Sequence, residues 1–375
     1  MKNVVIAGYA RSPFHFANKG ALAKVRPDDL GAAVVRDLIE KTGVKPDDVE
    51  DLICGCSFPE GEQGLNLARM LVFLSGLPNT VGAVTVNRFC GSSMQSVHQA
   101  AGAIAMGAGD VFICAGVESM TRVPIMGFNP MPNPTLYQEN PNAFMGMGDT
   151  AEVVAKRYEI SRDAQEKFAV ASHEKAAKAQ AEGRFRDEIV AIHGVDDDGC
   201  IRAGTTQADL ASLNPAFDAQ GTVTAGTSSP LTDGAAAVLV CSEEYATENG
   251  LDVLARIKSI AVSGCAPEVM GMGPVGATRK ALDRAGLSMG DMDVVELNEA
   301  FASQSLACIN ELGLDPARIN LDGGAIALGH PLGATGARLV GKVASVLKRE
   351  GAKYGLATQC IGGGQGIATI VEAVT

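Results

Sequence analysis

Three residues of this chain combine a reactive side chain with neighbouring glycine, and Cys90 is the first of them. It follows the strand-like run 83–86 and precedes Gly91 and a run of apolar residues at helical spacing. The positive end of such a helix lowers the pKa of a nearby thiol and favours the thiolate. Cys90 is therefore the leading candidate for a nucleophile, although most of the nine cysteines are expected to be buried and inert.

A thiol nucleophile needs a group that accepts its proton, and histidine is the usual base near neutral pH. The chain has five histidines, of which His330 lies in a turn rich in glycine and proline, directly before a second run of helical spacing. We expect His330 to be this base. Three of the other histidines are expected to be ordinary surface residues: His15, His173 and His193. The fourth, His98, is expected to be a core or interface residue.

Cys360 follows another strand-like run and precedes the glycines at 362–364. Their bare amides suit an oxyanion site beside a second thiol. The segment lacks the lysine of a P-loop and the full spacing of a dinucleotide fingerprint, so neither of those sites is predicted. A polar pair, Asn298 and Glu299, follows the run 294–297 and begins an expected helix. Asn298 could orient a water or a histidine, or it could simply cap that helix.

The elements that must position these residues alternate between strands and helices, which predicts an α/β fold with largely buried sheets. The expected strands are 4–7, 83–86, 111–117, 237–240, 254–262, 294–297 and 367–371. The expected helices are 27–41, 92–106, 150–158, 163–182, 276–285, 299–312 and 333–349. The charged residues of the helix 163–182 are expected to form a solvated face.

A weak internal repeat favours two similar halves. The segments 43–50 and 286–293 share a glycine, an apolar residue and an acidic pair, and each lies between an expected helix and a strand. Cys90 and His330, 240 positions apart, each open a glycine-containing turn before a helix of small residues. So few identities also arise by chance, so the repeat alone leaves both interpretations open.

The segment 123–148 differs from the rest of the chain because it holds five of the 16 prolines and four methionines. Proline suppresses regular structure, and a loop of this length in a compact protein is usually functional or disordered. Flexible thioethers suit an adaptable apolar surface. The same methionines could instead only anchor the loop to the protein.

Composition excludes several classes of protein. With 375 residues, 46% hydrophobic and 20% charged, the chain is long and apolar enough for a large core. A net charge of −12 argues against a general nucleic-acid binder. The scattered cysteines indicate reduced thiols, with no zinc site, in a reducing compartment, which we expect to be the cytoplasm. No secretory leader is recognisable, and no apolar run reaches the ~18 residues of a membrane helix.

Four segments resemble the signature blocks of the thiolase family and occur in that family's order: residues 87–95, 298–301, 329–331 and 360–366. The resemblance covers essentially the whole chain. It implies a five-layer αβαβα fold of two similar halves with an inserted loop domain. On this basis we expect the N-terminal half at 1–121 and 230–253, the loop domain at 122–229 and the C-terminal half at 254–375.

The resemblance also implies an activity, that of a 3-ketoacyl-CoA thiolase of fatty-acid β-oxidation. Cys90 would attack the 3-keto carbon and keep the acyl group while acetyl-CoA leaves, and His330 would take the thiol proton. Cys360 would protonate the acetyl-CoA carbanion, or remove the α-proton in the reverse condensation. One oxyanion hole would be the amides of Cys90 and Gly362, and the other His330 with a water held by Asn298. CoA would then accept the acyl group in ping-pong order.

Coenzyme A is expected as a co-substrate, with no permanently bound cofactor and no metal. The residues that match CoA or acyl contacts of the family are Arg202, Ala225, Gly226, Ser229, Met147 and Phe301. Asp209 replaces a family serine near the nucleotide. Gly146 stands where short-chain acetoacetyl-CoA thiolases commonly have histidine, which favours the degradative enzymes. The family also suggests a homodimer or homotetramer, and a multienzyme β-oxidation partner is possible.

Four alternatives to this interpretation differ in testable ways. An acetoacetyl-CoA thiolase running the Claisen condensation would use the same residues. A decarboxylating ketosynthase shares the fold but has histidine, or histidine and asparagine, as the partners of its cysteine, which Cys360 argues against. A non-catalytic lipid-binding member would lack Cys90, His330 or Cys360, and all three are present. A dinucleotide oxidoreductase lacks its glycine fingerprint here.

Overall fold

The strands of this protein are apolar along their length because most of them are covered on both faces. Every residue of β5 (Val111–Ser119) and β6 (Thr232–Ser242) is buried, as continuous apolar runs predict. The structure is a computed structural model that describes residues 2–374. Within that range ten strands form one mixed sheet. The other strands are β1 (Val4–Arg11), β2 (His15–Phe16), β3 (Asp51–Gly55), β4 (Gly82–Val86), β7 (Ala255–Gly264), β8 (Val294–Leu297), β9 (Tyr354–Ile361) and β10 (Gln365–Glu372).

The order of the strands confirms the two similar halves. The sheet runs β4-β3-β5-β6-β1-β7-β10-β9-β8, with β2 paired to β6. From the outside of the sheet toward its centre, the C-terminal half has the order β8-β9-β10-β7 and the N-terminal half, after β4, the order β3-β5-β6-β1. The two orders match position by position. In both halves the first pair is parallel and the next two are antiparallel. The halves join through two residue pairs, Val5 with Arg256 and Ile6 with Ala255. β4 has no counterpart and forms the edge of the sheet.

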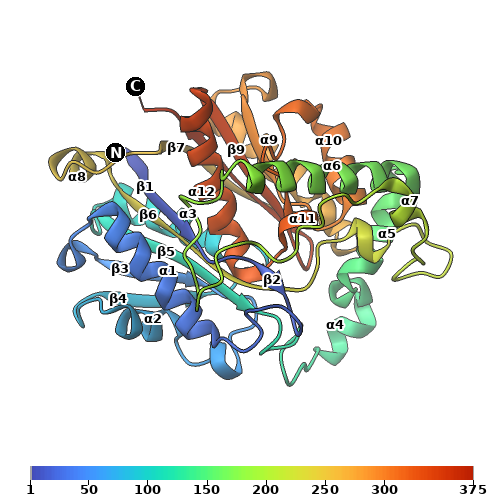
Figure 1. Cartoon of the computed structure of the whole chain (residues 1–375), viewed down its shortest axis with the longest axis horizontal. Coiled ribbons are helices and arrows are strands. Elements are labelled where there is room, and N and C mark those ends of the chain that lie inside the picture. The colour runs from blue at the N-terminus through green and yellow to red at the C-terminus, as the bar shows by residue number, and fades with distance from the viewer. Residues whose placement is uncertain (1, 375) are drawn as a thin grey trace.

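Helices separate the two halves of the sheet and cover their outer faces. α3 and α12 lie side by side in the middle of the molecule, with α1 and α2 on one side and α9 and α10 on the other (Figure 1). α12 packs against β1, β5 and β6 as well as β8 and β9, which makes the expected five layers. The helices are α1 (Pro27–Thr42), α2 (Leu67–Ser75), α3 (Ser92–Met106), α4 (Pro134–Glu139), α5 (Met147–Arg157), α6 (Arg162–Ala181), α7 (Gln207–Ala211), α8 (Glu243–Glu248), α9 (Gly273–Ala285), α10 (Ala302–Leu312), α11 (Ala325–Leu328) and α12 (Leu332–Glu350).

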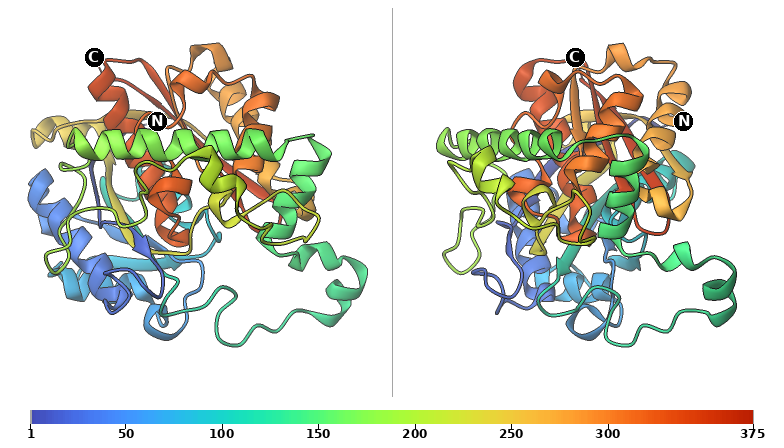
Figure 2. Two further views of the ribbon diagram at one scale, coloured as in Figure 1. Left: turned by 45° about the vertical axis from the view of Figure 1, so that its right-hand side comes forward. Right: turned by 90° about the vertical axis from the view of Figure 1, so that its right-hand side faces the viewer.

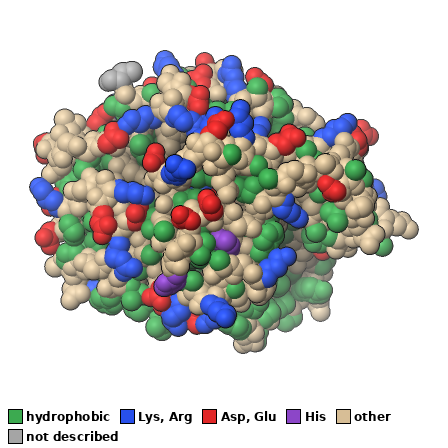
Figure 3. All heavy atoms as spheres, viewed as in Figure 1, with side chains coloured by type: hydrophobic (Ala, Val, Ile, Leu, Met, Phe, Trp, Pro, Cys, Tyr) green, Lys and Arg blue, Asp and Glu red, His purple; other side chains and the backbone are tan. Residues whose placement is uncertain are grey.

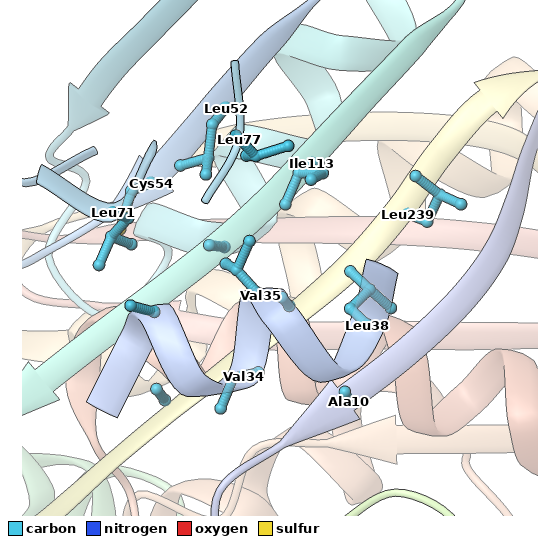
Figure 4. Close-up of a cluster of buried hydrophobic side chains, with 14 of the residues drawn as sticks. Ala10, Val34, Val35, Leu38, Leu52, Cys54, Leu71, Leu77, Ile113 and Leu239 are labelled. Carbon is cyan, nitrogen blue, oxygen red and sulfur yellow. The ribbon is translucent and has the colours of Figure 1, made fainter. Parts of the chain in front are cut away.

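The hydrophobic core follows these layers. The interface between α1, α2 and the N-terminal half of the sheet contains Val35 and Leu38, which point from α1 toward the strands (Figure 4). They meet Leu52 and Ile113, and all four side chains are at least 97% buried. Full burial of one such side chain contributes about 1.5–3 kcal/mol. Separate clusters fill the middle layer and the outer face of the C-terminal half.

The long connection between β5 and β6 contains α4 to α7 and none of the named strands. Its proline-rich part projects away from the sheet and carries α4 at its tip (Figure 2). This part is strongly exposed, with 81% for Met131 and 60% for Phe128. The end of the same loop turns back toward the protein, where Met147 begins α5 and packs with Phe301 and Cys360.

A buried ionic network joins this connection to both halves. Arg11 of β1 binds Asp198 through two hydrogen bonds of 2.7 and 2.8 Å and Glu188 through one of 2.8 Å. Lys342 of α12 bridges Glu188 at 3.0 Å and Asp322 at 2.8 Å. Each of these two cations has two anionic partners, and Asp322 also pairs with Arg349 at 2.6 Å, so no charge of this network is buried without a partner of opposite sign. The network holds three parts of the chain in one arrangement.

Several local expectations were wrong. The helix expected from residue 299 begins at Ala302, and Cys360 lies within β9 rather than after it. The helix α6 is not solvated along its whole charged side, since Glu166 is buried and paired with Arg162 at 2.7 Å. His173 is also buried, because α6 packs against α10 and α11. The helix α2 was not expected from the sequence.

Candidate active site

Cys90 lies in a tight turn between β4 and α3. The turn is closed by hydrogen bonds from Gly91 N–H to the Arg88 carbonyl and from Ser92 N–H to the Phe89 carbonyl, and Phe89 has a φ of 44°. A Cβ on Gly91 would lie 2.5 Å from the end of the Ile361 side chain, so a larger residue there would displace Ile361. The turn thus presents Cys90 directly before the N-terminus of α3, where the residue as a whole is half-buried.

Two backbone N–H groups, those of Gly362 and of Cys90 itself, act on the thiol of Cys90. Burial of the sulfur raises its pKa to about 11, while the N–H groups of Gly362 and of Cys90 itself favour the anion and lower it. The net direction differs from the lowering expected at a helix terminus, because desolvation outweighs the amide dipoles. The resting residue is therefore a neutral thiol that needs a base. The same two amides are the pair expected to form an oxyanion hole.

His330 is fixed by two threonines. The backbone N–H of His330 donates to Thr232 Oγ1 at 3.1 Å. Its ring atom Nδ1 lies 2.6 Å from Thr335 Oγ1. The Thr335 hydroxyl donates its single proton to the Pro331 carbonyl at 2.9 Å. It must therefore accept from Nδ1–H. This assigns the tautomer in which Nε2 is bare and able to take a proton.

Burial, and next to it the charge of Arg338, lowers the pKa of His330 to about 3. The imidazole is thus neutral at physiological pH and available as a base. Only a new negative charge beside it would stabilise the protonated ring.

Asn298 faces His330 rather than capping a helix. Its Nδ2 lies 3.4 Å from Nε2 of His330, and its buried Oδ1 has no hydrogen-bond partner among residues 2–374. The helix α10 begins only at Ala302 and has no side-chain cap. Asn298 follows β8 and donates its backbone N–H to Thr358 of the neighbouring strand β9. The amide is therefore held beside the strand that carries Cys360.

Cys360 is buried near the end of β9 in a small apolar cluster that includes Met270 and Phe301, with Met147 packed against it. Burial, and next to it the proximity of Cys90, raises its pKa well above the usual value. Gly362, two residues later, supplies the amide that reaches Cys90. One strand end thus carries both the second thiol and an amide donor for the first.

The two central helices bring Cys90 and His330 to the same region. Ala337 N–H donates to Ser93 Oγ at 2.8 Å, and a Cβ on Gly336 would lie 2.2 Å from the Met94 nitrogen. Because Cys90 comes two residues before α3 and His330 two residues before α12, this close packing determines their separation.

Glu118, at the end of β5 in the N-terminal half, forms hydrogen bonds with several segments around the same region. Its carboxylate accepts from Gly333 N–H at 2.8 Å, at the start of α12, and from Ser57 N–H and Gln63 Nε2, each at 2.8 Å. Burial raises its pKa although these donors oppose the rise. Glu118 thus fastens the segment that follows His330 to the strand β5.

The residues expected to contact the acyl group lie close to the thiols. Phe301 is 8% exposed and packs edge-on against Phe217, with ring centroids 6.0 Å apart. A Cβ on Gly362 would lie 3.5 Å from the sulfur of Met147 and 3.7 Å from the Phe89 ring. Together these groups form apolar walls around the two cysteines.

The residues expected to contact CoA lead outward from these walls. Ser229 donates its N–H to the carbonyl of Ala300 at 2.9 Å, while Ala225 and Gly226 form a short 3₁₀ turn before it. Gly226 packs closely on Leu210, since a Cβ there would lie 2.6 Å from that side chain.

Arg202 lies on the surface further along the same connection. Its guanidinium is 5.9 Å from the centre of the Phe16 ring, and its backbone N–H donates to His173 Nδ1 at 3.2 Å. Asp209 caps the first turn of α7 by accepting from the N–H and the hydroxyl of Thr206. Its carboxylate therefore has a local structural role, unlike a serine free to contact a nucleotide.

Sequence reasoning missed three residues of this site. Thr335 and Glu118 lie within segments that were considered, but only contacts from distant segments show what they bind. Gln359 precedes Cys360 in the sequence, and only the folded chain shows that its side chain donates to the carbonyl of Cys90. Within residues 2–374 no cluster of three or more His, Cys, Asp or Glu side chains could hold a metal ion. No helix in that range is long and apolar enough to cross a membrane.

Known proteins match this chain over nearly its whole length. The sequence model of the thiolase N-terminal domain matches residues 4–244, and that of the thiolase C-terminal domain matches 251–373. A 3-ketoacyl-CoA thiolase of Bacillus subtilis is 49% identical, covering 99% of this chain and 100% of that protein. One of Vibrio cholerae is 50% identical with the same coverage. The crystal structure of human mitochondrial 3-ketoacyl-CoA thiolase matches with a TM-score of 0.93 and 37% identity, over 100% of this chain and 99% of that one.

Proposed function

The chain belongs to the thiolase family, and from this premise we propose that it is an acyltransferase that cleaves 3-ketoacyl-CoA with CoA in fatty-acid β-oxidation. The products are acetyl-CoA and an acyl-CoA shortened by two carbons. One observation carries the proposal: Cys360 lies near the end of β9 in the cluster with Phe301 and Met147, and its neighbour Gln359 donates to the Cys90 carbonyl, so the two thiols belong to one site. Cleavage of a carbon–carbon bond beside a thioester needs both a nucleophile and a proton donor for the leaving carbanion.

In the first step Cys90 attacks the 3-keto carbon while its proton passes to Nε2 of His330. The 3-oxygen becomes an oxyanion, which is stabilised by the backbone N–H groups of Cys90 and Gly362. Because the pKa of Cys90 is about 11 and that of His330 about 3, the ion pair is unfavourable before substrate binds. Proton transfer therefore accompanies attack on the carbonyl, where negative charge develops beside the imidazolium.

In the second step the bond between C2 and C3 breaks, and its electron pair leaves as the enolate of acetyl-CoA. The enolate oxygen is stabilised by the newly formed Nε2–H of His330 and by a water on Asn298. The Cys360 thiol protonates that carbanion and becomes a thiolate, while the acyl group remains on Cys90 as a thioester. The raised pKa of Cys360 keeps it protonated until this moment. A buried thiol in an apolar cluster suits a proton donor that must not ionise early.

In the third step CoA enters and its thiol loses its proton to the Cys360 thiolate. The CoA sulfur attacks the thioester on Cys90, and the amides of Gly362 and Cys90 stabilise the oxyanion. The Cys90 sulfur then leaves and recovers its proton from His330, so all three residues return to their first state. Arg202 is the cation expected to meet the anionic nucleotide of CoA, with Ser229, Ala225 and Gly226 along the pantetheine arm.

Gly146 supports the degradative activity over an acetoacetyl-CoA thiolase. It precedes Met147 beside the thiols, at the position where the resemblance places a histidine in the short-chain enzymes. The apolar walls formed by Phe89, Met147 and Phe301 also suit a longer acyl chain.

The experiment is a chain-length series from acetoacetyl-CoA to 3-ketohexadecanoyl-CoA. Loss of the enolate absorbance after addition of CoA is followed, with chromatography of the products. We expect acetyl-CoA and the shortened acyl-CoA from substrates longer than acetoacetyl-CoA. Cleavage of acetoacetyl-CoA alone would favour the acetyl-CoA C-acetyltransferase, and no cleavage of any substrate would end the thiolase proposal.

Two further properties belong to this proposal. We propose a homodimer or homotetramer, supported by the unpaired edge strand β4, where Val84 is 39% exposed, and by nearby Leu65, which is 92% exposed. Sedimentation analysis tests it. We also propose a cytoplasmic location, supported by the nine free thiols.

The domain boundaries given above and the binding of a β-oxidation multienzyme partner remain proposals of the same kind. The net charge of −12, with basic and acidic side chains interspersed on the face seen in Figure 3, argues against nucleic acid as a partner.

A further inference from the structure

Gln359 reaches across from the C-terminal half of the sheet to the nucleophile turn. Its side-chain Nε2 donates a hydrogen bond to the backbone carbonyl of Cys90, and the side chain is fully buried. We propose that Gln359 is a positioning residue for Cys90, which holds the turn so that the sulfur meets the Gly362 amide. This inference rests on the proposed function, because it assigns Cys90 the nucleophilic role.

The chemistry of a buried amide distinguishes this role from simple packing. The Oε1 atom of Gln359 is buried and has no hydrogen-bond partner within the described residues. An acceptor left unpaired in the core destabilises a protein. Turning the amide over would place Oε1 against the Cys90 carbonyl, oxygen to oxygen, and would lose the one hydrogen bond. A side chain that only filled space would be better apolar, so the Nε2 donor is what the position uses.

The geometry of β9 explains what this hydrogen bond controls. Successive side chains of a strand point to opposite faces, so Gln359 and Cys360 point to opposite sides of β9. The same strand end leads to Gly362, whose amide reaches the Cys90 sulfur. Gln359 therefore connects the Cys90 main chain to the strand that carries the amide donor and the second thiol.

The nucleophile turn needs such a restraint. Phe89 adopts a φ of 44°, in a region that non-glycine residues rarely occupy. The start of the turn is held by Arg88, which binds Gln95 at 2.9 Å and Gln365 at 2.8 Å. Gln359 holds its end. Without that bond the peptide plane after Cys90 keeps the hydrogen bond from Gly91 N–H to the Arg88 carbonyl but loses its link to β9. The sulfur is then held less firmly in line with the Gly362 N–H.

The first test replaces Gln359 by leucine or methionine, which fill similar space without a donor. We expect kcat for thiolysis to fall about 10- to 100-fold, while KM for CoA changes less than about twofold. The rate of acylation seen in a rapid-mixing experiment should fall by the same factor as kcat. Circular dichroism establishes that each variant is folded.

A matched control is Gln304→Leu in α10. Gln304 is also fully buried and its Oε1 also lacks a partner, but its Nε2 contacts Cys308 rather than Cys90. We expect Q304L to retain kcat within about twofold. An equal fall of kcat in Q304L and Q359L would overturn the proposal, because it would show a general effect on packing.

Gln359→Glu provides a readout that a purely structural role would not move. A buried carboxyl has a raised pKa, and only its protonated form can donate to the Cys90 carbonyl. The ratio of Q359E activity to wild-type activity should therefore rise as the pH falls from 8 to 6. A ratio independent of pH, or a Q359L variant with wild-type acylation, contradicts the inference.

Substrate-free alkylation of Cys90 by iodoacetamide separates this inference from the proposed function. If Gln359 positions Cys90, Q359L changes the alkylation rate at Cys90 several-fold relative to wild type and Q304L. An unchanged rate counts against the inference. Absence of thiolysis by the wild type in the chain-length series would instead count against the proposed function, whatever the alkylation result.

Discussion

The hydroxyl of Thr335 should be required for His330 to act as a base. Thr335→Val keeps the size and branching of the side chain and removes only the oxygen that lies 2.6 Å from Nδ1. Both residues are at least 95% buried, so water cannot easily replace this oxygen. The ring is then left with an unpaired N–H, or it moves its proton to Nε2 and loses the atom that must accept from Cys90.

The size of the effect follows from that single contact. A buried donor left without its acceptor costs about 1–3 kcal/mol. If this cost appears when His330 takes the proton, kcat/KM falls roughly 5- to 150-fold. The free energy of unfolding should fall by about 1–2 kcal/mol at most, because valine fills the same space.

Initial rates of thiolysis and the rate of acylation of Cys90 measure the effect, with Thr335→Ser as the control. The serine keeps the hydroxyl, so T335S should remain within about threefold of wild type while T335V loses activity. Wild-type acylation by a folded T335V would refute the reasoning, because His330 would then need no partner at Nδ1. Equal losses in T335S and T335V would also refute it, since the methyl group would then be the important feature.

Three further predictions concern the network, CoA and pH. Asp322→Asn leaves buried Lys342 without one of its two anions. The free energy of unfolding, measured by urea titration, should therefore fall by about 3–5 kcal/mol, and a loss below ~1 kcal/mol argues against the network. Arg202→Met should raise KM for CoA several-fold at constant kcat. Cleavage of acetoacetyl-pantetheine, which lacks the nucleotide, should be unchanged. A lower kcat with both substrates would contradict the assignment of Arg202 to the nucleotide of CoA. Burial lowers the pKa of His98 to about 3, below the unfolded value of about 6.5, so its contribution is complete above pH 6.5 and is lost as the pH falls toward 3. In His98→Gln the stability should therefore fall less steeply between pH 6 and 4, by about 1.4 kcal/mol per pH unit, and identical slopes would exclude the burial effect.

The repeat shows how much of the fold was predictable. The apolar strands predicted buried sheets, and the similar segments near residues 43 and 286 favoured two related halves without excluding chance. The resemblance of four segments to the thiolase family was what implied those halves. The pairing of β1 with β7 was not predictable, since only the folded chain brings those strands together. The burial of His173 was missed for the same reason: α6 is charged in sequence, and its inner face appears only when it packs on the C-terminal half.

The site shows a similar division. Cys90 and His330 were recognisable because glycine turns before helices leave a clear pattern along the chain. Thr335 was within reach, since it lies five positions from His330 on the first turns of α12. Glu118 and Gln359 were out of reach, because each acts on a segment more than 200 residues away. The direction of the Cys90 pKa was also misjudged, because a sequence shows a helix terminus but not the burial that opposes it.

The central claim is that Cys90 carries the acyl group during turnover. Rapid acid quenching after mixing with 3-ketooctanoyl-CoA, followed by peptide mass spectrometry, tests this directly. We predict a six-carbon acyl group on the peptide containing Cys90, which disappears when CoA is added and is absent from Cys90→Ser. A stable acyl group on Cys360 or another residue, or turnover by the Cys90→Ser protein, would contradict the account.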